Sequence, residues 1–193
     1  RVGATELLSM PLIRDDFFDV LKKIYNEYIG GKQKKSKCRV ITIYSNKGGV
    51  GKTSIATNLA YELAKITKEN VALIDLNFQL GDVTTFLDLK PSFNISYMLQ
   101  NLDKINEEFL LSTLEKYKNT SLYVLADSPY FKEVDNIPSK DITKLFNILR
   151  ETFSYVVVDT SAGFEKNAMI ALENSDLIFL TSIINLPSVR NCQ

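Results

Sequence analysis

The chain has 193 residues, of which 45% are hydrophobic, and its 23 basic and 23 acidic side chains leave no formal net charge. This is the composition of a globular protein with enough apolar side chains for a core. Histidine is absent, which excludes an imidazole base, a Ser-His-Asp triad and a His-ligated zinc ion. Cys38 and Cys192 are too few for a disulfide framework or a metal cage, and no apolar run reaches the length of a membrane span.

The first predicted element is a helix near the N-terminus. Asp15 and Asp16 lie at its start, where the helix dipole favours anions, and apolar residues then recur at helical spacing, at Phe17, Leu21, Ile24 and Tyr28. Residues 30–37 contain two glycines, four lysines and no apolar side chain, which predicts a linker over residues 31–38. These lysines are most simply solvated, and a patch for DNA or an anionic lipid is the alternative.

Beyond the linker, strand patterns and helix patterns follow one another along the chain. The predicted strands are 39–45, 71–76, 122–126, 155–159 and 177–181. The predicted helices are 54–67, 105–117 and 141–152. Because short, continuously apolar strands separated by helices are typical of parallel sheets, the sequence predicts an α/β fold with helices on both faces of a mostly parallel sheet.

A glycine-rich loop lies between the first two of these elements. Residues 46–53 read Asn-Lys-Gly-Gly-Val-Gly-Lys-Thr, and a position between a strand and a helix is the context of a phosphate-binding loop rather than of a plain turn. The backbone N–H groups can form an anion nest, to which the following helix adds its positive end. In this loop Lys52 would face the β and γ phosphates of ATP, and Thr53 would serve Mg²⁺. The predicted nucleotide-binding residues are Lys47, Gly48, Gly49, Val50, Gly51, Lys52, Thr53 and Ser54.

Two aspartates end predicted strands. Asp75 follows the apolar residues 71–74, and Asp159 follows residues 155–158. In a parallel sheet, ligands gather at the carboxyl ends of the strands. An aspartate there can simply begin a turn, but two of them beside a phosphate loop favour a metal site. We therefore predict that Asp159 joins Thr53 in holding Mg²⁺.

The string Lys-Gly-Gly-Val-Gly-Lys-Thr at residues 47–53 resembles the deviant Walker A motif of the ParA/MinD family of ATPases. This resemblance implies a P-loop NTPase fold and a homodimer that sandwiches two ATP molecules. Within that dimer, Lys47 would reach the nucleotide of the other subunit. Asp159 resembles the Walker B carboxylate of the family, and Gly163 fits its second switch segment.

Asp75-Leu76-Asn77 resembles the first switch segment of the same family, which usually reads Asp-x-Asp. The resemblance implies that Asp75 is a further Mg²⁺ ligand and that the catalytic positions are Lys47, Asp75 and residue 77. Asn77 departs from the usual pattern, because its amide can hydrogen-bond a water molecule but carries no charge and takes no proton. We therefore expect ATP binding with slow hydrolysis.

Several further segments resemble one branch of the family, CpaE/TadZ of the Tad-type pilus assembly systems: residues 75–83, 86–89, 101–103, 108–110 and 186–191. The resemblance implies an ATPase domain over residues 39–193, incomplete at its C-terminus. It also implies that residues 1–30 are the last strand and helix of a degenerate receiver-like domain, in which Met10 replaces the usual lysine. The resemblance further implies a bacterial cytoplasmic protein that lies at a cell pole or at the inner-membrane face. Its implied function is to position a pilus or secretion assembly machine.

Three alternative functions remain open from the sequence. A ParA-like partitioning ATPase would bind non-specific DNA through a basic surface, but the ten Lys and Arg residues after Asn77 are scattered. A MinD-like ATPase would associate with the membrane, directly or indirectly, through an amphipathic segment. A metabolic enzyme related to dethiobiotin synthetase would need a substrate pocket that the sequence does not indicate. We expect a homodimer and pilus assembly partners rather than DNA.

Overall fold

The structure is a computed structural model, and it describes residues 13–24, 38–78, 81–93, 95–126, 137–183, 185, 188 and 190. The strand predicted near the N-terminus, before the helix, and nearly all of the predicted linker lie outside the described residues. The chain divides into two compact units. One contains residues 37–182, and the other contains residues 1–36 with residues 183–193.

The second of these units contains helix α1 (Arg14–Ile24). Its first turn carries Asp15 and Asp16, and its last turn carries Lys22 and Lys23. Acidic residues at the start and basic residues at the end of a helix both interact favourably with its dipole. The helix predicted here from apolar spacing is therefore confirmed within the described residues.

Residues 37–182 are built on a six-stranded sheet with the order β3-β4-β2-β5-β1-β6. The strands are β1 (Arg39–Tyr44), β2 (Val71–Asp75), β3 (Glu115–Lys116), β4 (Leu122–Leu125), β5 (Tyr155–Asp159) and β6 (Leu177–Leu180). All of them run parallel except β3, which pairs antiparallel with β4. Every residue of β2 and β5 is buried, as expected for central strands covered on both faces.

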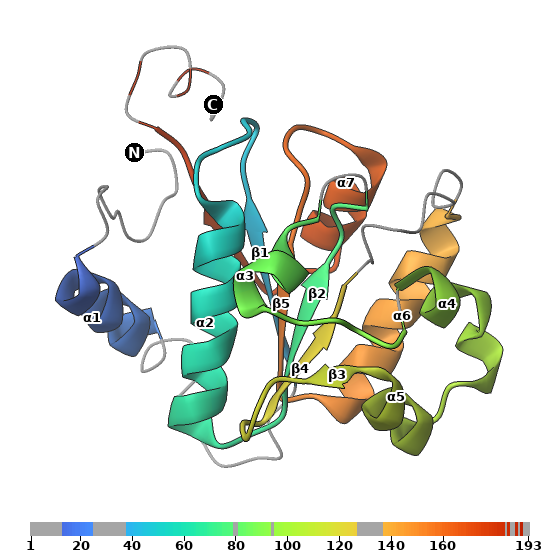
Figure 1. Cartoon of the computed structure of the whole chain (residues 1–193). Coiled ribbons are helices and arrows are strands. Elements are labelled where there is room, and N and C mark those ends of the chain that lie inside the picture. The colour runs from blue at the N-terminus through green and yellow to red at the C-terminus, as the bar shows by residue number, and fades with distance from the viewer. Residues whose placement is uncertain are drawn as a thin grey trace. The chain divides into compact units, whose positions relative to one another are not determined.

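Helices cover both faces of this sheet (Figure 1). On one face lies α2 (Lys52–Thr67), which contacts β1, β2, β4 and β5. On the other face lie α6 (Ser139–Thr152) and α7 (Lys166–Glu173), whose buried residues form one core cluster with alternate residues of the central strands, including Val40, Ala72, Ile74, Val156 and Val158. The remaining helices are short: α3 (Val83–Leu87), α4 (Ile95–Gln100), η2 (Leu102–Lys104) and α5 (Glu107–Thr113).

The predicted α/β architecture is confirmed, but one predicted helix is wrong in extent. The helix expected over residues 105–117 begins after Asn106, whose side-chain oxygen accepts a hydrogen bond from Phe109 N at 2.8 Å, and it ends at Thr113. Leu114 is extended and buried, and Glu115 and Lys116 form β3 instead of a further helical turn. Pairing with β4 therefore overrides the local helical preference.

Arg150 connects three chain segments at the edge of the sheet opposite the phosphate loop. Its Nη1 donates to Asp176 Oδ2 at 2.8 Å and to Cys38 O at 3.2 Å, and its Nη2 donates to Asn174 O at 2.7 Å. Asp176 Oδ2 also accepts a hydrogen bond from Val40 N at 2.8 Å. The guanidinium therefore holds the end of α6, the start of β1 and the loop before β6 together.

We expect Arg150→Ala to lower the free energy of unfolding by about 1.5–3 kcal/mol, the scale of hydrogen bonds to a charged group whose partners are left behind. Urea unfolding followed by circular dichroism measures this loss. Lys140→Ala, at an exposed position of the same helix, is the control and should leave the stability within about 0.5 kcal/mol of wild type. Equal stabilities of the two variants would contradict this role of Arg150.

Candidate nucleotide and magnesium site

Three neighbouring strands of the sheet, β2, β5 and β1, end at the candidate site. Asp75, the last residue of β2, lies directly opposite Asp159, the last residue of β5. Asp159 in turn pairs with Ile43 of β1, two residues before the loop that begins at Ser45. The parallel register therefore brings the two predicted carboxylates and the glycine-rich loop together, as the sequence predicts.

The loop has the backbone conformation that an anion nest requires. Gly49 and Gly51 have φ values of 71° and 88°, in the left-handed region that glycine enters without steric cost. The 16-residue helix α2 begins directly after the loop, at Lys52, and Ile55 N donates to Gly51 O at 3.0 Å. The first turn of α2 contains no acidic residue, so the positive end of the helix stays available for a phosphate group.

The cationic and hydroxyl side chains of the loop differ in burial. Lys52 is only 9% exposed, and a charge on a largely buried residue acts in a medium of lower dielectric constant than water. Lys47 and Ser54 are half-buried, whereas Gly48 and Gly49 are exposed. This arrangement suits a phosphate chain that enters from solvent and meets Lys52 at the inner end of the loop.

Ser45 organises the start of this loop, although the sequence did not single it out. Its hydroxyl oxygen accepts a hydrogen bond from Lys47 N at 3.1 Å, and its carbonyl oxygen accepts one from Gly163 N at 3.0 Å. The side chain of Thr160 donates to Ile43 O at 2.8 Å. The last two hydrogen bonds join the segment after β5 to the end of β1 and to the start of the phosphate loop.

Thr53 and Asp159, the residues predicted to share a metal ion, are hydrogen-bonded. Thr53 Oγ1 donates to Asp159 Oδ2 at 2.6 Å, so the lone pairs of the hydroxyl remain available to a cation. Burial raises the pKa of Asp159 to about 6, although the hydrogen bond from Thr53 and the charge of Lys52 act in the opposite direction. The loss of hydration on burial therefore outweighs the stabilisation of the charged carboxylate by Thr53 and Lys52.

Asp75 is also buried, with 2% of its surface exposed. Its Oδ1 accepts a hydrogen bond from Asn77 N at 2.9 Å, and its Oδ2 accepts one from Val83 N at 3.4 Å. Burial, with a further contribution from the charge of Asp159, raises the pKa of Asp75 to about 8. Two adjacent carboxylates with raised pKa values are the electrostatic condition in which a divalent cation is most stabilising.

The residues present fit a Mg²⁺ ion. Asp159 Oδ1 and Ser161 Oγ are buried and have no hydrogen-bond partner among the residues that the structure describes. Buried oxygens without partners cost free energy unless a ligand, an ion or water satisfies them. Mg²⁺ prefers one or two carboxylates, a hydroxyl, water and substrate phosphate, which matches Thr53, Asp75 and Asp159 beside a phosphate loop. When bound, the ion would neutralise charge on the phosphates.

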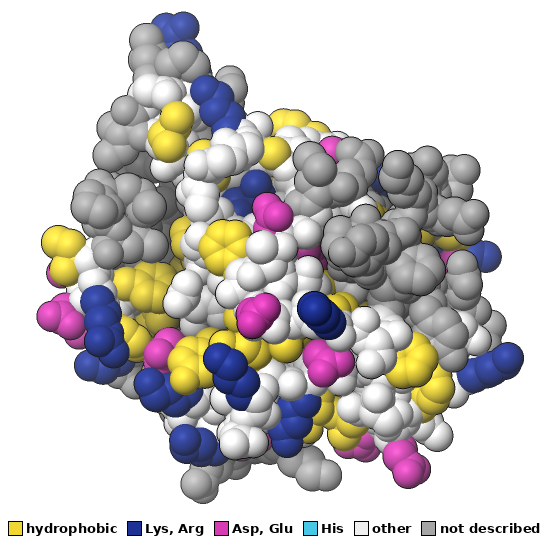
Figure 2. Space-filling view, in the orientation of Figure 1, with side chains coloured by type: hydrophobic (Ala, Val, Ile, Leu, Met, Phe, Trp, Pro, Cys, Tyr) yellow, Lys and Arg dark blue, Asp and Glu magenta, His cyan; other side chains and the backbone are white. Residues whose placement is uncertain are grey.

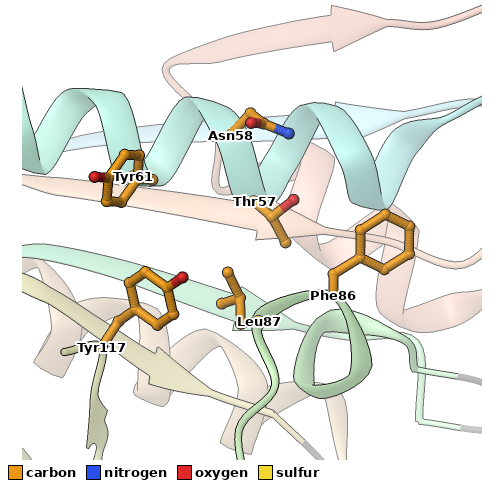
Figure 3. Close-up of a pocket in the computed structure, with 6 residues that line it drawn as sticks. All are labelled: Thr57, Asn58, Tyr61, Phe86, Leu87 and Tyr117. Carbon is orange, nitrogen blue, oxygen red and sulfur yellow. The ribbon is translucent and has the colours of Figure 1, made fainter.

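A separate groove of about 270 Å³ lies beside α2 rather than at the phosphate loop. Figure 3 shows Thr57, Asn58 and Tyr61 on α2, with Phe86 and Leu87 of α3 and Tyr117 facing them. The rings of Tyr61 and Tyr117 meet edge to face, with centroids 6.0 Å apart. This groove contains no carboxylate and no glycine loop, so we do not assign the nucleotide to it.

Comparison with known proteins agrees with this geometry. A family model described as an AAA domain, AAA_31, matches residues 38–189. The septum site-determining protein MinD of Helicobacter pylori is 28% identical over 153 residues, which cover 79% of this chain and 55% of that protein. The chain therefore spans little more than half the length of this curated relative.

Two solved structures share the fold. The ParA family ATPase from Chlorobium tepidum aligns with a TM-score of 0.72 and 24% identity over 79% of this chain and 63% of that one. The MinD in the MinC:MinD cell division complex of Aquifex aeolicus aligns with a TM-score of 0.66 and 28% identity over 80% and 60% of the two chains. The family model covers most of the length of this chain, and the relatives of the chain are of the MinD and ParA types. The chain therefore belongs to the AAA_31 family, among the ParA/MinD deviant Walker A ATPases.

Proposed function

We propose that the site binds ATP with Mg²⁺ and that the bound nucleotide switches the protein between monomer and homodimer. The observation that carries this proposal is the hydrogen bond between Thr53 and Asp159 beside a loop with two lysines. A phosphate loop needs only one lysine, here Lys52, to bind the phosphates of its own nucleotide. Lys47 is therefore available for a different contact. In the proposed dimer, Lys47 contacts the phosphates bound by the other subunit, where an added cation offsets negative charge.

Each site residue has a stated task in this proposal. The backbone N–H groups of residues 48–53 bind the phosphate chain, and Lys52 neutralises its β and γ groups. Thr53, Asp75 and Asp159 would hold Mg²⁺. Asn77 lies at the place of a second switch carboxylate and positions the attacking water weakly, which makes the protein a slow ATPase.

The biological task that we propose is positioning of a Tad-type pilus or secretion assembly machine, as in the CpaE/TadZ branch. The supporting observations are the branch-like segments of the sequence, and a relative whose name describes the determination of a septum site. Residues 1–30 would then end a receiver-like domain, residues 31–38 would form a linker, and residues 39–193 would belong to the ATPase domain. Assembly proteins of the pilus are the proposed partners, and the cytoplasmic side of the inner membrane is the proposed location.

A second candidate is a MinD-like positioning ATPase that associates with the membrane, and the MinD relatives favour it. No helix in the described part of the chain is long and apolar enough to cross a bilayer. Co-sedimentation of the protein with anionic vesicles, with ATP and with ADP, tests this candidate. ATP-dependent sedimentation would favour it over the pilus proposal.

DNA binding of the ParA type receives less support from the surface. Figure 2 shows Lys and Arg side chains interspersed with Asp and Glu side chains on one face of the molecule. A surface that binds DNA without sequence preference usually concentrates basic side chains, because its affinity comes from contacts with phosphate groups. We therefore keep partitioning as the weaker alternative, to be tested by DNA binding at graded salt concentrations.

The proposed switch predicts a specific defect in Lys47→Ala. The backbone N–H of Lys47, which bonds Ser45 at 3.1 Å, is retained in this variant, so the loop should keep its shape and still bind nucleotide. The side chain that crosses to the partner is lost, and the ATP-dependent dimer should disappear. Light scattering with ATP and with ADP measures the mass, and a fluorescent ATP analogue measures binding.

Lys65→Ala is the matched control for this experiment, because Lys65 is exposed on α2 and pairs only with Glu62 of its own helix among the ion pairs of the described residues. It should dimerise with ATP as wild type does. A dimer that forms identically with and without ATP, in wild type and in Lys47→Ala alike, would contradict the switch.

A further inference from the structure

Gly81 lies against the carboxyl group of Asp75. A Cβ atom placed on Gly81 would lie 2.5 Å from Asp75 Oδ2, 3.0 Å from Asp75 Cγ and 2.9 Å from the carbonyl oxygen of Asn77. The first of these separations is shorter than any ordinary contact between a carbon and an oxygen atom. No side chain, not even a methyl group, fits at residue 81 unless Asp75 or the backbone moves.

The backbone conformation of Gly81 does not itself require glycine. Three other glycines of the described chain, Gly49, Gly51 and Gly163, have positive φ values, and a Cβ on any of them would meet no atom within 4 Å. For Gly81 the situation is reversed, since its φ lies outside the left-handed region while its Cβ position is occupied. The demand for glycine at residue 81 therefore comes from the close approach to Asp75.

The segment that contains Gly81 also holds both oxygens of the same carboxyl group. Asn77 N donates to Oδ1 and Val83 N, at the start of α3, donates to Oδ2. The adjacent Leu76 N donates to the carbonyl oxygen of Asp159 at 2.9 Å. Residues on both sides of Gly81 thus close around Asp75 at the point where it faces Asp159.

We propose that Gly81 is a positioning residue for the magnesium site: its lack of a side chain lets the segment after β2 close on Asp75 and fixes the direction of that carboxyl group. This inference rests on the proposed role of Asp75 as a Mg²⁺ ligand. A methyl group at residue 81 displaces Oδ2, loosens the hydrogen bond from Val83 N and leaves the carboxyl group misdirected. Residues that orient a metal ligand in this way typically affect metal affinity 10- to 100-fold, so the effect is measurable.

The first test measures how nucleotide binding depends on Mg²⁺. Wild type, Gly81→Ala and the control Thr85→Ala, which changes an exposed residue of α3, are titrated with MgCl₂ in the presence of a fluorescent ATP analogue. We expect Gly81→Ala to need about ten times more Mg²⁺ or more for half-maximal binding. Binding of the analogue in EDTA should be the same in all three proteins.

The outcome separates this inference from the proposed function. If binding by wild type is independent of Mg²⁺, the proposed function itself fails, and the positioning role fails with it. If wild type depends on Mg²⁺ and Gly81→Ala follows the wild-type curve, the inference alone is overturned.

A double-variant cycle tests the contact without any nucleotide. Replacing glycine by alanine at a compatible backbone position normally raises stability, because it restricts the unfolded chain. We expect Gly81→Ala to lower the melting temperature instead, and to lower it by clearly less when Asp75→Ala has already removed the Oδ2 and Cγ contacts. Equal losses in the two backgrounds, including a failure to fold in both, would overturn the inference.

Discussion

Lys52→Ala should weaken ATP binding by about 2–4 kcal/mol, the scale expected when one partner of a buried charged contact is removed. This corresponds to a roughly 30- to 700-fold increase in Kd. The effect is large because the Lys52 side chain is buried at the inner end of the loop, where water cannot replace its charge at the β and γ phosphates. Isothermal calorimetry with ATP and Mg²⁺ measures the loss directly.

The matched control for this variant is again Lys65→Ala, on the exposed side of the same helix. Its ion pair with Glu62 spans 3.6 Å at the surface, and pairs of that kind contribute little. Both variants should keep the circular dichroism spectrum of wild type. Unchanged ATP affinity in a folded Lys52→Ala protein would remove the central claim about the phosphate loop.

Asn77→Asp should accelerate the single-turnover hydrolysis of ATP by up to about 10²–10⁴-fold, the range that a positioned general base contributes. Asn77 is half-buried, and its backbone N–H bonds Asp75 Oδ1, so a carboxyl group at residue 77 would lie next to the proposed metal ligand. The amide of Asn77 in the wild-type protein cannot take a proton from the attacking water. Wild type should therefore turn over below about 1 s⁻¹, the lower end of the range for ordinary enzymes.

Asn77→Ala shows how much the amide of Asn77 itself contributes to hydrolysis. If the amide only orients water weakly, its removal should change the rate far less than the introduction of a carboxyl group does, and ATP affinity should stay close to wild type in both variants. Rapid quench with radiolabelled ATP gives these rates. Brisk hydrolysis by wild type, or an Asn77→Asp protein that is no faster, would show that another carboxylate such as Asp75 or Asp82 serves the attacking water.

The parts of the site that depend on local chemistry could be predicted from the sequence. The glycines and Lys52 of the loop are contiguous, and their flanking strand and helix carry clear apolar patterns. Asp75 and Asp159 are distant in the chain, but parallel strands present their carboxyl ends at one edge of the sheet. Topology alone therefore placed the two aspartates together, and the register confirms it.

The parts that depend on contacts between distant residues could not be predicted. Ser45 matters because its carbonyl oxygen meets Gly163 N, and no spacing in the sequence indicates such a contact. The sequence predicts helix at Glu115 and Lys116, and these residues are extended because they pair with β4. The sequence does not predict the short helix α7, because its apolar residues, 168–172, are consecutive and show no helical period. The sequence does not indicate a role for Gly81, because its close approach to the side chain of Asp75 is apparent only in three dimensions.

The most direct test of the central claim is a crystal structure of the protein with a slowly hydrolysed ATP analogue and Mg²⁺. We predict a homodimer in which Lys52 contacts the β and γ phosphates of its own subunit and Lys47 contacts the nucleotide of the other. Thr53 and Asp159 should lie at the Mg²⁺ ion. A monomer with the nucleotide outside the loop, or a dimer in which Lys47 points away from both nucleotides, would contradict the account.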